Sequence, residues 1–244
     1  MKDTIQKGRL ENNIYYLPDI QLDRKEYLKC AKHLKFLGGK WNRNKKGFVF
    51  DRDIESIEEL LGDNIQKQKE IQFFETPEKI ADYIVELAEI GDNMKVLEPS
   101  AGRGAIIKSI KKVFNGTIDY CEIDPINRKY LEKIDDIHNL SNTGDFLDNK
   151  SLYFVLYFDR IIANPPFSKN QDIDHIRQMY SVLSAGGILV SIASKHWQIS
   201  TNKKETAFRQ WLDDVGAEII ELPEKEFKES GTNIATTIIK IKKY

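Results

Sequence analysis

The C-terminal two thirds of the chain alternate short strand-like runs with segments whose apolar residues recur at helical spacing. The strand-like runs lie at residues 95–97, 117–122, 137–140, 159–163, 187–193, 218–222 and 234–241. Apolar residues recur every three to four positions in the helix-like segments at about 76–88, 104–113, 126–133, 173–183 and 206–215. This alternation predicts an α/β fold, a doubly wound and mostly parallel sheet with helices on both faces.

The first 65 residues follow a different pattern. Strand-like segments lie at 14–17 and 47–50, and helices are predicted at 23–36 and 53–61 with Asp23 and Asp53 as caps. A polar stretch at 66–70 is typical of a linker. The pattern predicts a small α+β module over residues 1–65 and a larger domain over residues 66–244.

Total charge gives no indication of a partner, because 37 basic residues nearly balance 38 acidic ones. Local charge does: residues 24–48 hold nine Lys or Arg against Glu26 alone, nine minus one, or a net charge of plus eight. Such a cluster with interleaved aromatics suits phosphate contacts and base stacking. The proposed nucleic-acid contacts in this module are Lys40, Trp41, Arg43 and Lys45. The alternative is a solvated helix face with Trp41 in the small core.

Cysteine use and hydropathy indicate the compartment. Cys30 and Cys121 form no metal-ligand pattern and no disulfide framework, so no metal site is predicted. The N-terminus lacks the apolar core of a signal peptide, and no apolar run approaches the roughly 18 residues that span a bilayer. We therefore expect a cytoplasmic protein.

A glycine-containing loop follows the run at 95–97. It comprises Glu98-Pro99-Ser100-Ala101-Gly102-Arg103-Gly104, and its glycines allow a tight turn and close approach to a ligand. Glu122 follows Gly102 by 20 residues, at the end of the next strand, where a carboxylate can accept ribose hydroxyls. Such a glycine pair also occurs in structural turns, and the third glycine of a dinucleotide-binding loop is absent.

Gly144-Asp145-Phe146 follows the third predicted strand. In a doubly wound sheet this turn lies on the same edge as Gly102 and Glu122. Asp145 can accept a hydrogen bond from an adenine amino group, and Phe146 can cover the ring. Alone, Gly-Asp is a common surface turn; with the other two elements it predicts an adenosine pocket.

Asn164-Pro165-Pro166-Phe167 follows the fourth predicted strand. Two consecutive prolines fix two φ angles and remove two N–H donors, which gives a stiff turn with outward carbonyls. The Asn164 side-chain oxygen and the Pro165 carbonyl can then hold the two hydrogens of an exocyclic amine, so that catalysis is largely positioning. Phe167 can stack on a base extruded from a duplex.

These elements together resemble the S-adenosylmethionine-dependent amino-methyltransferases of nucleic acids, over residues 73–241. The resemblance is strongest to the gamma-arranged DNA adenine N6 enzymes, in which a cofactor-closing element, here residues 74–77, precedes the glycine loop. It implies a seven-stranded Rossmann-like methyltransferase sheet, S-adenosylmethionine as cofactor and a flipped adenine as substrate. The cofactor-binding residues that it implies are Phe74, Thr76, Pro77, Glu98, Ser100, Gly102, Gly104, Glu122, Ile123, Asp145, Phe146 and Asn164. The catalytic residues that it implies are Asn164, Pro165, Pro166 and Phe167.

Two departures leave the substrate open. Tyr is commoner than Phe at position 167 among adenine N6 enzymes, and Phe also occurs in ribosomal RNA guanine N2 enzymes. Enzymes with the gamma arrangement usually carry a target-recognition domain after the catalytic domain, whereas the given sequence ends at Tyr244. Target recognition is therefore expected from the N-terminal module, from loops or from a partner.

The preferred prediction is a DNA adenine N6 methyltransferase of a restriction–modification, phage or orphan system. An RNA enzyme acting on adenine N6 or guanine N2, a glutamine side-chain methylase and a non-catalytic binding subunit are the alternatives. The basic module argues against a protein substrate.

Two further segments are expected near the substrate. Lys195 and Trp197, after the strand at 187–193, are predicted to contact nucleic acid. Residues 227–232 resemble the family's final motif, where an aromatic side chain packs near the flipped base.

Overall fold

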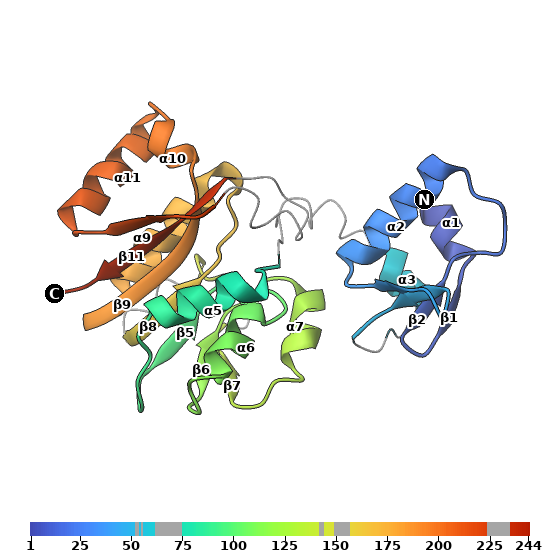
Figure 1. Ribbon diagram of the computed structural model, residues 1–244, viewed down its shortest axis with the longest axis horizontal. Helices are drawn as coiled ribbons and strands as arrows, with labels where there is room; N and C mark the ends of the chain where they lie inside the picture. The colour runs from blue at the N-terminus through green and yellow to red at the C-terminus, as the bar shows by residue number, and fades with distance from the viewer. Residues whose placement is uncertain (52–53, 55, 62–74, 142–143, 149–156, 224–234) are drawn as a thin grey trace. The chain divides into compact units, whose positions relative to one another are not determined.

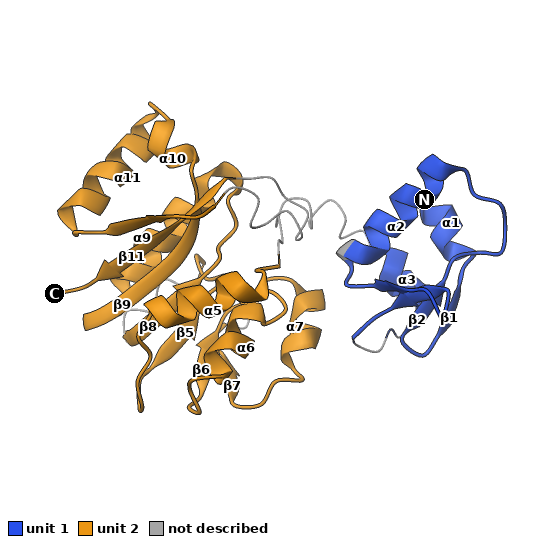
Figure 2. Cartoon of the chain, viewed as in Figure 1, with its two compact units in different colours: residues 1–67 blue, residues 68–244 orange. Residues whose placement is uncertain are grey.

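The computed structural model of the 244-residue chain describes residues 1–51, 54, 56–61, 75–141, 144–148, 157–223 and 235–244. Its contacts divide the chain into two compact units, Met1–Lys67 and Gln68–Tyr244 (Figure 2). This boundary lies two residues beyond the one that composition predicts. The predicted linker at 66–70 and the predicted Asp53 cap lie outside the described residues.

Unit 1 is a small α+β module around an antiparallel sheet with the strand order β1-β2-β4-β3. Its elements are α1 (Lys2–Gln6), β1 (Arg9–Glu11), β2 (Ile14–Tyr16), α2 (Arg24–Phe36), β3 (Lys40–Asn42), β4 (Gly47–Val49) and α3 (Ile57–Leu61). The sequence predicts β2, α2, β4 and α3 but not α1, β1 or β3. The missed elements are mostly charged or polar, with a single apolar residue in each, so they give no amphipathic pattern.

The core of unit 1 lies between its sheet and its helices. Tyr15, Phe48 and Phe50 are fully buried, and the Tyr15 hydroxyl donates to the Ile5 carbonyl at 2.7 Å. Helix α2 begins as predicted, because the Asp23 carboxylate accepts the backbone N–H of Glu26 at 2.9 Å. Three buried aromatic side chains and the Tyr15 hydrogen bond therefore form the centre of this core.

Unit 2 contains a seven-stranded sheet with the order β10-β11-β9-β8-β5-β6-β7 (Figure 1). Its strands are β5 (Val96–Glu98), β6 (Ile118–Tyr120), β7 (Ile137–Asn139), β8 (Phe158–Ala163), β9 (Leu183–Ser194), β10 (Glu218–Glu221) and β11 (Thr236–Lys242). Its helices are α5 (Glu78–Leu87), α6 (Ala105–Lys111), α7 (Pro125–Leu131), the short 3₁₀ turn η1 (Ser168–Asn170), α9 (Gln171–Ser181), α10 (His196–Ile199) and α11 (Lys203–Asp214). Neighbouring strands are parallel from β9 to β7, and β11 runs antiparallel to both β9 and β10. The predicted Rossmann-like sheet is confirmed.

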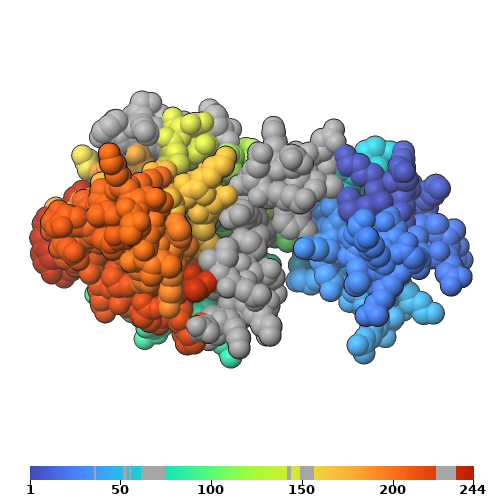
Figure 3. All heavy atoms as spheres, turned by 90° about the horizontal axis from the view of Figure 1, so that it is seen from above, coloured from blue at the N-terminus to red at the C-terminus, as the bar shows by residue number. Residues whose placement is uncertain are grey.

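Two cores cover the two faces of this sheet. Val96 and Ile162 pack with α5 and α6, whereas their neighbours Leu97 and Ile161 pack with α9 and α11. Successive residues of a strand point to opposite faces, so a sheet buried on both faces needs continuous apolar runs. Figure 1 shows α5, α6 and α7 on one side of the sheet. In Figure 3 the segments coloured orange and red, which include α10, α11 and β11, pack closely together.

The element boundaries differ from prediction mainly after β8. The short helix α10 is not predicted, and β9 begins four residues earlier than the expected run at 187–193. Glycine is depleted in strands, so Gly186 and Gly187 give no strand signal near the start of β9. No helix in the described part of the chain is long and apolar enough to cross a membrane.

Candidate active site

The parallel strands bring four predicted motifs to one edge of the unit 2 sheet. In β5 and β8, which are neighbours, Leu97 lies opposite Ile161. Ala163 is therefore level with the start of the glycine loop, and Asn164 follows directly. Chain order reverses between β5 and β8, so this is a switch point, where doubly wound sheets bind ligands.

The glycine loop is shaped by left-handed backbone. Gly104 has a φ of 81° and precedes α6, and a Cβ there would lie 2.7 Å from the Ile134 side chain. The positive φ at this position favours glycine, because other residues rarely adopt left-handed backbone. The Ala101 N–H donates to the Cys121 carbonyl at 3.0 Å, which ties this loop to the end of β6.

Glu122 joins the glycine loop to the turn after β6. Its carboxylate accepts the backbone N–H of Gly102 at 2.6 Å and that of Asp124 at 2.7 Å. Burial raises the pKa of Glu122 to about 7, and these two hydrogen bonds oppose the rise. Asn127 Nδ2 also donates to this carboxylate, at 3.4 Å. A carboxylate has about four acceptor positions, so one remains for a ligand hydroxyl.

Asp124 caps α7, because its side chain accepts the Ile126 N–H at 2.9 Å. Ile123, between Glu122 and Asp124, leaves 43% of its side chain exposed. Of this predicted acidic element, Ile123 is thus the residue with an apolar surface open to a ring.

Glu98 and Ser100 supply polar atoms that a ligand can satisfy. Glu98 is 1% exposed, and burial and the nearby Glu122 raise its pKa well above the ordinary value. Among the described residues, Glu98 Oε2 and Ser100 Oγ are buried without a hydrogen-bond partner. Buried polar atoms are normally paired, so these two fit a polar ligand at the glycine loop.

The Gly144 turn packs directly on the Glu122 segment. Gly144 has a φ of 77°, and a Cβ there would lie 2.0 Å from the Glu122 carbonyl oxygen. Asp145 accepts the Leu147 N–H at 2.8 Å. The contact with the Glu122 segment requires glycine and places Asp145 next to the preceding turn.

Phe146 lies in the core rather than on the site's surface. Its side chain is 1% exposed, and its ring centroid lies 5.7 Å from that of His175. The ring therefore has little free surface for an adenine in this structure, and the role of Phe146 in covering an adenine ring stays a prediction.

Asn164 and Thr76 meet although 88 residues separate them. Asn164 Nδ2 donates to Thr76 Oγ1 at 3.0 Å, and Thr76 is 7% exposed. Thr76 does not cap α5: Pro77 occupies the cap position, without a side-chain bond, and the helix begins at Glu78. The predicted cofactor residue Phe74 lies outside the described residues.

The rest of the Asn-Pro-Pro-Phe segment is partly enclosed. Pro165 is buried, whereas Pro166 and Phe167 are intermediate in exposure, with Phe167 packed against the α5 side of the core. Lys169 and Asn170 follow with φ values of 54° and 59°. Left-handed backbone at two successive residues other than glycine is costly, so other contacts must hold it.

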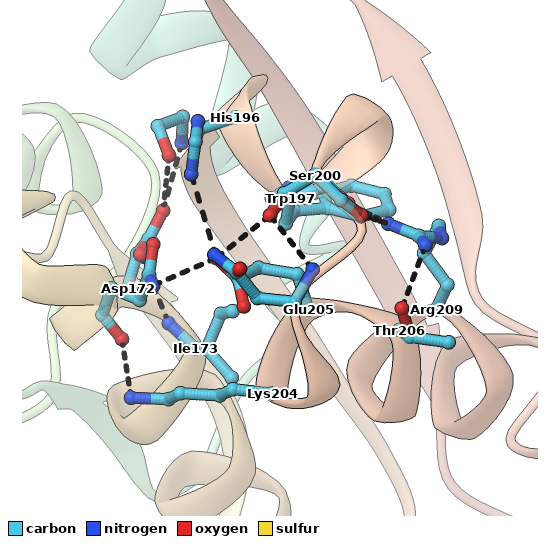
Figure 4. A network of polar contacts seen from close by, with 12 residues as sticks. Asp172, Ile173, His196, Trp197, Ser200, Lys204, Glu205, Thr206 and Arg209 are labelled. Atoms are coloured by element: carbon cyan, nitrogen blue, oxygen red, sulfur yellow. Dashed lines mark hydrogen bonds and ion pairs between the residues drawn. The ribbon is translucent and has the colours of Figure 1, made fainter.

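Glu205 of α11 supplies such a contact, and the sequence analysis missed it. Its carboxylate accepts Asn170 Nδ2 at 3.0 Å, Ser200 Oγ at 3.1 Å and Asn202 Nδ2 at 3.2 Å (Figure 4). The side chain is 1% exposed. Glu205 thus joins the loop after β8 to the loop after β9. A glutamate in the first turn of a polar helix gives no sequence signal for this role.

Asp172 and Arg209 fix the same region. The Asp172 carboxylate accepts the backbone N–H of Ser194 at 3.0 Å and its hydroxyl at 2.8 Å, and burial raises the pKa of Asp172. Arg209 donates to the carbonyls of Trp197 and Ser200, and Figure 4 shows these contacts beside Glu205. Polar contacts therefore hold the segments that follow β8 and β9 together.

The predicted substrate contacts after β9 are only partly available. Trp197 is 5% exposed and packs edge-on against Phe208, with ring centroids 5.4 Å apart. Helix α10 turns the ring into the core, so Trp197 offers little surface here, and its contact with nucleic acid stays a prediction. Lys195 forms an ion pair with Glu221 and keeps 29% of its side chain exposed. Residues 227–232 lie outside the described ranges.

The predicted contact residues of unit 1 lie around the hairpin of β3 and β4. Arg43 and Lys45 are exposed, and Lys40 pairs with Asp51 at 3.0 Å. Trp41 is 40% exposed, with its ring edge-on to Phe48 at a centroid distance of 5.1 Å. Trp41 thus lies at the margin of the small core: one part of its ring packs on Phe48, and another part is open to a partner.

No protein-family model and no curated protein matches the chain. Among solved structures, a type I restriction–modification methyltransferase subunit from Streptococcus thermophilus aligns with a TM-score of 0.58 at 18% identity, covering 78% of this chain and 50% of that one. A modification subunit of a type I restriction enzyme candidate from Vibrio vulnificus gives 0.56 at 14% identity, covering 77% and 49%. A candidate RNA methyltransferase from Pyrococcus horikoshii gives 0.51 at 17% identity, covering 71% and 88%.

The chain therefore has the Rossmann-like fold of S-adenosylmethionine-dependent methyltransferases, a class that also includes a structural neighbour from Listeria monocytogenes described as class I, with a TM-score of 0.50. It spans about half the length of the two restriction–modification subunits. At these identities the likeness defines the fold, and the chemistry has to be argued from the site.

Proposed function

We propose that unit 2 binds S-adenosylmethionine and methylates the exocyclic amino group of a nucleic-acid base, adenine N6 in DNA. The observation that carries this proposal is the position of Asn164-Pro165-Pro166-Phe167 at the end of β8, beside the glycine loop of β5. An amine held by this segment lies next to a ligand held by the glycine loop.

The residues proposed to hold the cofactor belong to the glycine loop and to the turn after β6. Ser100 and Glu98 offer the buried polar atoms, Glu122 offers the remaining acceptor capacity, and Ile123 offers an apolar surface. When bound, S-adenosylmethionine supplies an electrophilic methyl group. The chain's contribution is to exclude water and fix the orientation.

Asn164 and Pro165 are proposed to hold the exocyclic amine that accepts the methyl group. The Asn164 side-chain oxygen and the Pro165 carbonyl each accept one N–H hydrogen, which directs the nitrogen lone pair away from both. The nitrogen would gain the methyl group as the S–CH₃ bond of the sulfonium breaks, leaving a neutral thioether, and the methylated nitrogen would then lose one proton to solvent. Phe167, half-buried beside this segment, stacks on the flipped base.

DNA is the proposed substrate because the two neighbours with the higher TM-scores are named as restriction–modification subunits. An RNA substrate, with adenine N6 or guanine N2 as target, is the second candidate. It is supported by the Pyrococcus horikoshii neighbour and by Phe at position 167.

Unit 1 is proposed to bind the backbone of the same nucleic acid. Helix α2 exposes Arg24, Lys25, Lys29, Lys32 and Lys35. Glu26, the single acid of residues 24–48, is engaged by the N-terminal amine and by the Thr4 hydroxyl, and these bonds lower its pKa. The positive charge of α2 is therefore not neutralised within its own helix, which suits phosphate contacts.

The deciding experiment measures transfer of labelled methyl groups to duplex DNA, structured RNA and protein. The expected result is label on adenine N6 of DNA that Asn164→Ala abolishes. Label on RNA alone would move the proposal to its second candidate. Transfer that survives Asn164→Ala would refute the proposed chemistry.

Unit 1 is tested by nucleic-acid binding over a range of salt concentrations. The triple variant Lys40→Glu, Arg43→Glu, Lys45→Glu is compared with Lys79→Glu, Lys108→Glu, Lys133→Glu, which changes net charge equally on unit 2. We expect only the first to weaken binding and to reduce the salt dependence by about two to three counterions. Equal behaviour of the two variants would show that only total charge matters.

A further inference from the structure

The contact between Thr76 and Asn164 carries an inference that rests on the proposed function. The family resemblance implies that Thr76 is a cofactor-binding residue, and it gives Thr76 no role toward Asn164. In the structure its hydroxyl oxygen accepts Asn164 Nδ2 at 3.0 Å, and the residue is 7% exposed. The hydroxyl does not cap α5, which begins after Pro77 without a side-chain cap. We propose that Thr76 is a positioning residue that orients the Asn164 amide toward the substrate amine.

The chemistry of the amide gives the reason. A side-chain amide presents an acceptor oxygen and a donor NH₂ group of nearly equal size. An exocyclic amine presents two donor hydrogens, so it needs the oxygen and is repelled by the NH₂ group. With Nδ2 bound to Thr76, Oδ1 lies on the other side of the planar amide. The opposite orientation would set donors against donors.

The two residues that make this contact lie far apart along the chain, 88 positions from each other. Thr76 precedes α5, which packs on one face of the sheet, and Asn164 follows β8 in the middle of the sheet. The contact thus transmits the placement of α5 to the acceptor site. Displacements of about 1 Å at a reacting group can reduce rates by as much as 100-fold.

The test compares Thr76→Val, which keeps the branched shape, with Thr76→Ser, which keeps the hydroxyl. In the full-length protein we expect Thr76→Val to lower kcat roughly 10- to 100-fold. The Kd for S-adenosylmethionine should be unchanged, and Thr76→Ser should retain most of the wild-type kcat. Thermal melting of both variants separates this effect from loss of the fold.

A readout independent of methyl transfer is the side-chain amide resonance of Asn164 in ¹⁵N-labelled protein, assigned by its loss in Asn164→Asp. Slow hydrogen exchange in wild type and Thr76→Ser, with fast exchange in Thr76→Val, supports the contact even if no substrate is methylated. In that case the proposed function fails while the positioning contact stands. A raised Kd for S-adenosylmethionine with unchanged kcat would make Thr76 a cofactor contact and overturn the inference. So would a Thr76→Val protein with the wild-type kcat and exchange rate.

Discussion

Glu122 makes the stability of unit 2 depend on pH in an unusual direction. Burial raises its pKa from an ordinary 4.5 to about 7 in the folded chain. Between these values the folded state binds more protons than the unfolded state, so stability falls as pH rises. A group with a raised folded-state pKa contributes its full stabilisation below the unfolded value and has lost it above the folded value.

The magnitude follows from the two pKa values. Their difference of about 2.5 corresponds to at most about 3.4 kcal/mol of unfolding free energy. Between pH 5 and pH 8 the expected loss is about 2.5 kcal/mol, because part of the transition lies below pH 5. Glu122 is 5% exposed, so solvent screening reduces this figure little.

The assay is urea unfolding at pH 5, 6, 7 and 8, with Glu122→Gln as the perturbation. Both proteins carry Glu98→Gln, which imitates the neutral acid at that position and removes the neighbouring carboxyl from the titration. The stability difference between the two proteins should change by about 2.5 kcal/mol from pH 5 to pH 8. A difference that stays constant with pH would refute the reasoning, as would a carboxyl ¹³C titration of Glu122 with an ordinary midpoint.

Other substitutions test the packing of the site. Gly144→Ala should destabilise unit 2 by at least about 2 kcal/mol, since it combines left-handed strain with a Cβ placed 2.0 Å from the Glu122 carbonyl oxygen, and a urea titration measures this. Phe146→Ala should cost about 3–5 kcal/mol in the same assay, as expected of a core ring. Trp197→Phe should leave the KM for nucleic acid unchanged in steady-state kinetics, because the ring is buried; a raised KM would restore the contact predicted from sequence. Asp124→Ala should cost about 1 kcal/mol by loss of the α7 cap, seen as a lower melting temperature, and an unchanged Tm would contradict the cap.

Much of the fold was predictable because local periodicity carried it. The apolar runs at β5, β8 and β9 are buried on both faces, and such strands are read directly from sequence. The Gly102–Gly104 loop and the Asn164–Phe167 turn were equally visible, since glycine and proline restrict the backbone locally. The strands β1 and β3 were not, because each has a single apolar residue between charged or polar ones. The four-residue helix α10 is too short for a helical period to show.

The sequence by itself determined the class of fold and the residue types at the edge of the sheet. Only the tertiary structure decided what those residues do. The sequence shows only that Phe146 and Trp197 are aromatic. In the structure Phe146 packs against His175 and Trp197 packs against Phe208, so both are core residues. The Thr76–Asn164 and Glu205–Asn170 contacts join residues 88 and 35 positions apart. Such pairs depend on how helices pack against the sheet, which no local pattern encodes, so the sequence specified the chemical groups and the fold specified their partners.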